Sequence, residues 1–250
     1  MKYICGVDES GITNNHNNLL KKILNNYELK ENQKFSLITM ILIKEDEYSY
    51  FKKELKILKI NLLKNKKIKL HTSDFLNKRN LFLNYEISEL KEFLFSFLNI
   101  IENLNFKIYQ VFIDKESHLK KYKEKSIDPY FLASKYFINK ISKLKLPIDL
   151  IFERRSYNLD IELLKNLYTW NYFKNDDLNI YFLNKRINDD YEIIELADFV
   201  SYFLFISYLK YDDKYFAKVK VLSEENEDLL VMIKRILFLK ISNYSFKKID

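Results

Sequence analysis

The chain has 250 residues, of which 48% are hydrophobic and 16% aromatic, so it can bury a large core and is not intrinsically disordered. Its single cysteine excludes a disulfide framework, and the longest apolar stretch near the C-terminus, 199–209, is too short to span a bilayer. The formal net charge of +7 would fit an anionic partner. It is weak support for one, because the chain is biased towards Lys, Asn and Ile as a whole, and part of the charge reflects this bias. We therefore expect a cytoplasmic protein without a leader and without a membrane partner.

The first half of the chain predicts three strands and two helices. The strands are short apolar runs and the helices carry apolar residues at helical spacing; in chain order they are strand Tyr3–Val7, strand Phe35–Ile43, helix Asp46–Leu63, helix Ile87–Leu104 and strand Phe106–Ile113. Residues 12–33 are polar and rich in Asn, which indicates an insertion between the first two strands. The basic run 64–67 favours a solvated loop over a phosphate contact.

The second half continues the alternation of helices and strands. Pro129 directly after Asp128 marks the start of a helix that runs to about residue 144. The elements that follow are strand Ile148–Phe152, helix Asn158–Phe173, strand Leu178–Leu183, a helix from Asp189 or Asp190 to Leu209, and a last helix at about 225–239. This order predicts one α/β domain over residues 1–250, with a mixed sheet flanked by helices and a helical extension at about 210–250.

Three of the predicted strands end on an acid, at Asp8, Asp114 and Glu153. In α/β sheets, the residues just beyond the strand ends line the ligand crevice. The first acid begins the sequence Asp-Glu-Ser-Gly at 8–11, which also fits a tight turn, and Glu9 is expected to point away from Asp8. Asp114 has a second interpretation as the cap of the turn that follows it.

A fourth acidic feature lies on the predicted helix that ends at Leu209. Glu195 and Asp198 are three residues apart, so both project from nearly the same face of this apolar helix. An acid on a buried helix has to be ion-paired, neutral or bound to a cation.

Together these acids predict a carboxylate site for a divalent metal. Mg²⁺ and Mn²⁺ prefer hard oxygen ligands, and crowded carboxylates repel one another unless cations neutralise them. Two such ions, about 4 Å apart, can activate a water and stabilise the leaving oxygen of a phosphodiester without a nucleophile from the protein. A chain with one Cys and three His suits this chemistry.

Five segments resemble domain of unknown function 3800, a group of bacterial and phage proteins. In chain order they are DESG (8–11), HTSDF (71–75), FIDK (112–115), FERR (152–155) and ELADFVSY (195–202). The resemblance spans about residues 3–208, and it implies an RNase H-like fold with a nuclease-like site. The chain departs from the family pattern at Glu195, where a Gln is usual, and in the insertion at 12–33.

The resemblance also implies roles for individual residues. RNase H-like nucleases place one acid on the first strand, one on a later strand and one or two on the last core helix, and these places fall on Asp8, Glu153 and Asp198, with Glu195 as a fourth ligand. His71 lies in a matching segment, which favours it as a proton shuttle or phosphate contact.

The sequence therefore predicts a Mg²⁺- or Mn²⁺-dependent nuclease that hydrolyses phosphodiester bonds of DNA or RNA. Two alternatives stay open: an inactive RNase H-like module that binds nucleic acid or a protein, for example in phage defence, and a phosphohydrolase of small substrates. Arg154 and Arg155 fit either a phosphate clamp or ion pairs with acids.

Overall fold

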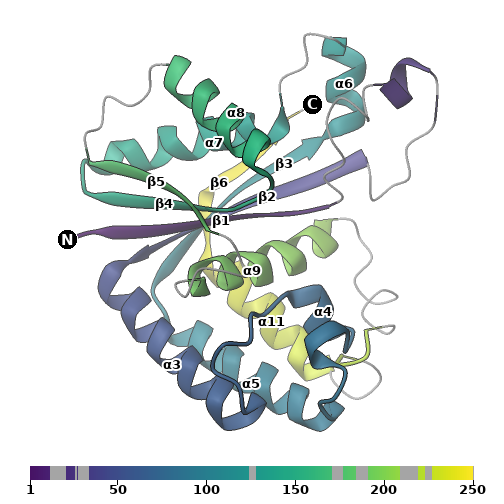
Figure 1. Ribbon diagram of the computed structural model, residues 1–250, viewed down its shortest axis with the longest axis vertical. Coiled ribbons are helices and arrows are strands. Elements are labelled where there is room, and N and C mark those ends of the chain that lie inside the picture. Colours follow the sequence, from purple (N-terminus) through teal and green to yellow (C-terminus); the bar gives the residue numbers. More distant parts are fainter. Residues whose placement is uncertain are drawn as a thin grey trace.

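The frame of the molecule is a mixed sheet, which in the computed structural model has six strands within the described part of the chain (Figure 1). The structure describes residues 1–11, 21–25, 27, 34–123, 128–170, 177–183, 191–208, 219–222 and 227–249. The strands lie in the order β5-β4-β1-β2-β3-β6, with the bounds β1 Tyr3–Ser10, β2 Phe35–Lys44, β3 Phe106–Asp114, β4 Ile148–Glu153, β5 Leu178–Leu183 and β6 Ile241–Ile249. Strand β2 is antiparallel to both neighbours, whereas β1–β4, β4–β5 and β3–β6 pair in parallel.

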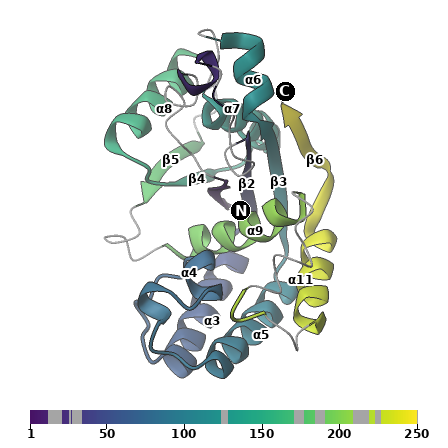
Figure 2. The ribbon, with the colours of Figure 1, turned by 90° about the vertical axis from the view of Figure 1, so that its right-hand side faces the viewer.

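Helices cover both faces of this sheet (Figure 1). Their bounds are α3 Glu45–Leu63, α4 Thr72–Leu76, α5 Ile87–Asn103, α6 Lys115–Tyr122, α7 Pro129–Ile141, α8 Tyr157–Thr169, α9 Glu192–Tyr208 and α11 Glu227–Lys240, with 3₁₀ turns η1 Asn80–Phe82 and η3 Ser142–Leu144. Helices α7 and α8 pack on one face, and α9 lies on the other with α3, α5 and α11 around it (Figure 2). The predicted α/β domain with a mixed sheet flanked by helices is confirmed.

The alternation of side chains along β1 divides the core into two parts. Cys5 and Val7 are buried with α7 and α8, whereas Ile4 belongs to the core around α9. Gly6 also faces α9, and a Cβ on it would lie 2.6 Å from the backbone oxygen of Ile193. The glycine therefore lets α9 lie directly on β1, which brings the acids of this helix close to the strand.

The structure corrects the predicted end of the first strand. Strand β1 continues past Val7 to Ser10, because Asp8, Glu9 and Ser10 still pair with Thr39, Ile38 and Leu37 of β2. Asp8 is therefore a strand residue and not the first residue of a turn. Only Gly11, with φ of 104°, leaves the strand.

The C-terminal prediction is wrong in its last part. The predicted helical extension at about 210–250 contains α11, but residues 241–249 form β6 along the outer edge of β3 (Figure 2). Without this strand, the N–H and C=O groups on that edge of β3 would have no ladder partner. Of the predicted insertion at 12–33, only residues 21–25 and 27 are among the described residues.

None of the helices in the described ranges is both long and apolar enough to cross a membrane.

Candidate functional site

Three of the predicted site residues meet on the α9 side of the sheet. Strands β1 and β4 pair in parallel up to Val7 and Phe152, so Asp8 and Glu153 follow this pair side by side. Asp198 comes from α9, which packs against both strands. Asp8 is 3% exposed, whereas Glu153 and Asp198 are half-buried. The cluster of Asp8, Glu153 and Asp198 therefore has a buried base and a partly open rim.

The electrostatics of this cluster centre on Asp8. Burial raises the pKa of Asp8 well above its ordinary value of 3.8, and the charges of Asp198 and Glu153 raise it further. The protonated Asp8 donates a hydrogen bond to Glu153, which adds to the same effect. Ionising Asp8 beside the other two acids is therefore unfavourable, and a proton on Asp8 or a cation beside it would offset this cost.

Two neutral side chains hold the outer acids of the cluster. The Tyr191 hydroxyl, just before α9, donates to Glu153. Burial and the nearby carboxylates of Glu153, Asp8 and Asp198 raise the pKa of Tyr191, so it stays a donor. Thr72, the first residue of α4, donates to Oδ2 of Asp198 from its backbone N–H at 2.6 Å and from its hydroxyl at 2.7 Å.

The structure places Glu195 apart from the cluster, as half of a buried ion pair. Its two oxygens lie 2.9 Å and 2.6 Å from Nζ of Lys59 in α3, and Oε1 also accepts the Leu70 N–H at 2.8 Å. The Lys59 and Glu195 side chains are 4% and 0% exposed. The prediction of Glu195 as a metal ligand is therefore not supported by its geometry, since both oxygens already have partners.

His71 lies beside the cluster, at the N-terminal boundary of α4. Its neighbour Thr72 binds Asp198, whereas its own Nδ1 lies 3.5 Å from Oδ2 of Asp74. The His71 side chain is 44% exposed, so it is accessible to solvent.

Two other strand-end acids fall outside the site. Asp114 accepts hydrogen bonds from the backbone N–H and the hydroxyl of Ser117, so it caps α6 and the capping interpretation holds. Glu9 points to the opposite face of the sheet, as predicted. Burial raises the pKa of Tyr130 on α7 and the charge of Glu9 raises it further, whereas burial lowers the pKa of Lys115 and Glu9 opposes that shift.

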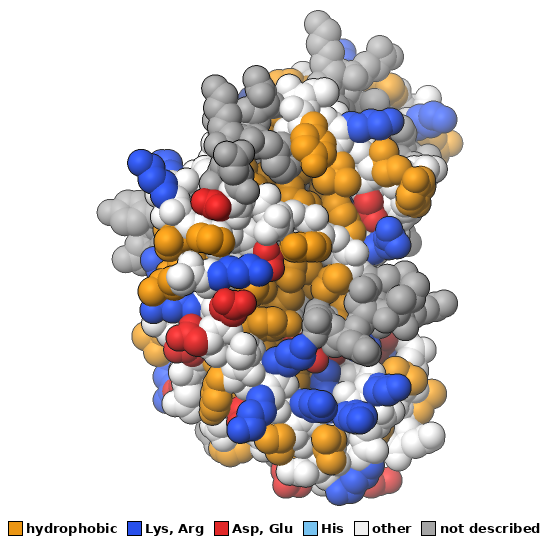
Figure 3. Space-filling model, turned by 60° about the vertical axis from the view of Figure 1, so that its left-hand side comes forward, with side chains coloured by type: hydrophobic (Ala, Val, Ile, Leu, Met, Phe, Trp, Pro, Cys, Tyr) orange, Lys and Arg blue, Asp and Glu red, His pale blue; other side chains and the backbone are white. Residues whose placement is uncertain are grey.

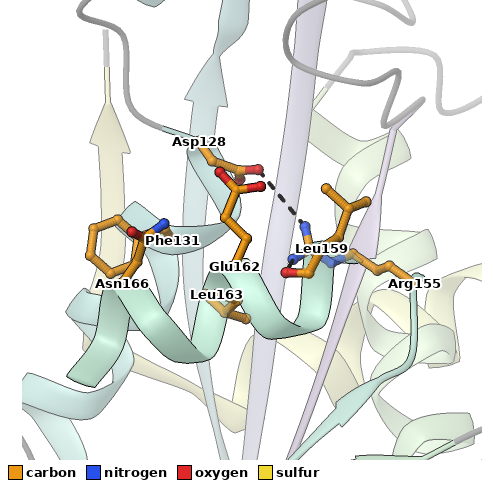
Figure 4. Close-up of a pocket in the computed structure, with 7 residues that line it drawn as sticks. All are labelled: Asp128, Phe131, Arg155, Leu159, Glu162, Leu163 and Asn166. Carbon is orange, nitrogen blue, oxygen red and sulfur yellow. Dashed lines mark hydrogen bonds and ion pairs between the residues drawn. The ribbon is translucent and has the colours of Figure 1, made fainter. Parts of the chain in front are cut away.

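Arg154 and Arg155 make ion pairs on that opposite face. Arg154 Nε lies 3.4 Å from Asp160, and the Arg155 guanidinium lies 4.0 Å from Asp128 and 4.0 Å above the ring of Tyr130. Arg155 borders a pocket of about 200 Å³ between α7 and α8 that is also lined by Asp128, Phe131, Leu159, Glu162, Leu163 and Asn166 (Figure 4). The ion-pair interpretation therefore describes both arginines.

Among the described residues, no group of three or more His, Cys, Asp or Glu side chains is arranged so that it could hold a metal ion as it stands. The hydrogen bonds of the three acids explain why their oxygens do not converge on one point. Protonated Asp8 donates a hydrogen bond to Glu153, and Oδ2 of Asp198 accepts two from Thr72, so oxygens of all three acids already take part in hydrogen bonds. A divalent ion would replace the Asp8 proton, and three carboxylates supply the hard oxygen atoms that Mg²⁺ or Mn²⁺ prefers. The chemistry of these residues fits such an ion.

Sequence reasoning missed Thr72 and Tyr191. Thr72 stands within the segment that resembles the family, but only the fold shows that α4 meets α9 there. Tyr191 directly precedes a long apolar helix, and one of 19 tyrosines carries no signal of its own.

Comparison with known proteins adds no family to this picture: neither the protein-family models nor the curated proteins searched match the chain. The resemblance to domain of unknown function 3800 rests on its five segments and stays a prediction.

Proposed function

We propose that this protein is a divalent-metal-dependent nuclease with an RNase H-like sheet, which hydrolyses phosphodiester bonds of DNA or RNA. The observation that carries the proposal is the convergence of Asp8, Glu153 and Asp198 from the first strand, a later strand and a late helix. This is the distribution of acids that the family resemblance implies. Carboxylates placed close enough to raise the pKa of Asp8 repel one another, and such arrangements are typical of functional sites.

Mg²⁺ or Mn²⁺ held by these three carboxylates would supply an activated water and stabilise charge on the phosphodiester. The contribution of the chain is to keep the carboxylates in place. Thr72 fixes Asp198 through one oxygen, Oδ2, and Tyr191 fixes Glu153. Such outer hydrogen bonds commonly change metal affinity or activity by about 10- to 100-fold.

His71 supports the proposal as a group that can exchange protons with solvent. It directly precedes Thr72, which binds Asp198, and its side chain is 44% exposed, so it is placed to exchange protons between water and a substrate bound over the outer side of α4. Glu195 takes no part in this chemistry, because Lys59 and the Leu70 N–H already occupy its oxygens.

The charge distribution supports an anionic substrate. Exposed lysines lie on α3 and in the loop after it, at positions 53, 56, 64, 66 and 67. Figure 3 shows many Lys and Arg side chains over the lower half of the face turned to the viewer, which is the half that holds the helices packed beneath α9. A basic surface of this kind attracts the phosphates of a nucleic acid.

The test is cleavage of labelled single-stranded, duplex, hybrid and branched DNA and RNA with Mn²⁺ or Mg²⁺. We expect cleavage by the wild-type protein that chelation abolishes and that Asp198→Asn lowers by about 10³-fold, as for residues that act as one catalytic unit. Asp114→Asn is the matched control, since this strand-end acid caps α6 outside the cluster and Asn also serves as a cap.

Absence of cleavage of all these substrates would overturn the proposal. Metal binding without cleavage would then favour the inactive nucleic-acid-binding module. Hydrolysis confined to mononucleotides or phosphate monoesters would favour the phosphohydrolase.

A further inference from the structure

The four residues before and at the start of α4, Lys69–Thr72, form an extended strap against α9. His71 has φ of −120° and ψ of 113°, which is strand-like backbone. Two acids of α9 hold the strap by alternate N–H groups, since Glu195 accepts from Leu70 at 2.8 Å and Asp198 accepts from Thr72 at 2.6 Å. The strap is therefore fixed by the same helix that supplies an acid to the cluster.

Alternation along this extended backbone gives the strap two sides. Leu70 and Thr72 are 7% and 3% exposed, and they point inward to α9. Lys69 and His71, which alternate with these two residues along the chain, are more exposed, so they lie on the outer side. The hydrogen bonds to α9 thus determine where these two nitrogen-bearing side chains are presented.

The ammonium group of Lys69 lies on the ring of Tyr191, the residue that binds Glu153 of the cluster. Its Nζ is 5.6 Å from the centre of the Tyr191 ring, and the hydroxyl of this tyrosine donates to Glu153. Lys69 also follows the exposed basic run 64–67 along the chain. Lys69 is therefore the last of four lysines that follow one another closely along the chain between α3 and α4.

We propose that Lys69 contacts a backbone phosphate of a nucleic-acid strand bound at the cluster, an inference that rests on the proposed nuclease function. Without a metal, the carboxylates of the cluster disfavour a phosphate beside them, and a positive charge at the neighbouring strap offsets part of that repulsion. A lysine ammonium binds phosphate as a point charge, and the hydrogen bonds of the strap fix the backbone from which this one projects.

The experiment measures binding without cleavage, in an Asp8→Asn background. Fluorescence anisotropy of labelled single strands of about 20 nucleotides, one of DNA and one of RNA, gives the affinity over a series of KCl concentrations. Adding Lys69→Met should weaken binding about 5- to 10-fold at low salt. It should also lower the slope of log K against log salt by about 0.7, the value for one phosphate contact on a single strand. Lys69→Arg should retain most of the affinity.

Lys165→Met is the control, because Lys165 is exposed on α8, on the other face of the sheet. Thermal melting checks that each variant is folded. The inference is overturned if the Asp8→Asn protein binds neither strand, or if Lys69→Met leaves both affinity and salt slope unchanged. The nuclease proposal is judged separately, by cleavage with the wild-type protein.

Discussion

Replacing Asp8 by Asn is expected to abolish cleavage and, in the absence of metal, to stabilise the folded protein at neutral pH. Asn fits the same strand position but carries no charge to be buried beside Glu153 and Asp198. The loss of cleavage should be about 10³-fold or more. The gain in stability should be about 1 to 2 kcal/mol, which is equivalent to about 2 to 8 °C in Tm for a chain of this size.

The pH dependence gives this prediction its sign. The folded-state pKa of Asp8 is raised above 3.8, so between these two values folding takes up a proton. Stability that depends on this proton is present in acid and is lost as the pH rises through the folded-state pKa. The difference in Tm between Asp8→Asn and wild type, measured in chelator, should therefore grow from about pH 4 towards neutral pH.

Asp149 provides the matched control for Asp8. It is a buried acid on β4, but its oxygens bind Lys2 at 2.6 Å and Asn179 at 3.0 Å. Asp149→Asn should therefore bring no stabilisation at neutral pH. A lower Tm for Asp8→Asn than for wild type across the whole pH range would contradict the prediction. It would show that the Asp8 side chain stabilises the folded protein.

The largest effect on stability is expected from breaking the Lys59–Glu195 pair. Lys59→Met leaves the Glu195 carboxylate buried with only the Leu70 N–H as a partner. Removing one member of a buried pair typically destabilises a protein by about 3 to 5 kcal/mol. Urea denaturation should show this loss as a lower midpoint.

The double variant Lys59→Met with Glu195→Gln tests whether the unpaired buried charge of Glu195 causes the loss of stability. Gln is the residue of the family pattern at this position, and its amide oxygen can still accept the Leu70 N–H. We expect the double variant to recover most of the lost stability and to retain cleavage, since Glu195 lies outside the cluster. A double variant as unstable as Lys59→Met, or one that folds but does not cleave, would contradict this assignment.

Arg235 and Glu102 offer a control pair at the same distance, 2.6 Å, but with side chains 58% and 38% exposed. Arg235→Met should cost less than about 1 kcal/mol, because solvent screens an exposed pair. The comparison isolates burial as the cause of the large effect at Lys59.

Much of the fold was predictable because the apolar runs and helical spacing are strong local signals. Helix α3 begins at Glu45 where Asp46 was predicted, and α5 ends at Asn103 where Leu104 was predicted. The misses are elements that depend on partners distant in sequence. Strand β1 runs on to Ser10 because β2 pairs with it there, and β6 forms where the edge of β3 is available.

The site shows the same division. Asp8 and Glu153 could be singled out because each follows an apolar run in the sequence, and Asp198 because it interrupts an apolar helix. Spacing on a helix could not separate Asp198 from Glu195, since both project towards one side. Their surroundings differ because Lys59 of α3 reaches Glu195, a contact between residues 136 positions apart.

The most direct test of a metal site at Asp8, Glu153 and Asp198 is calorimetric titration of Mn²⁺ into the purified wild-type protein and its Asp198→Asn variant at neutral pH. We predict saturable binding to the wild type, with protons released as Asp8 ionises, and loss of that binding in Asp198→Asn. A wild-type protein that binds no Mn²⁺, or a variant that binds it equally well, would contradict the site.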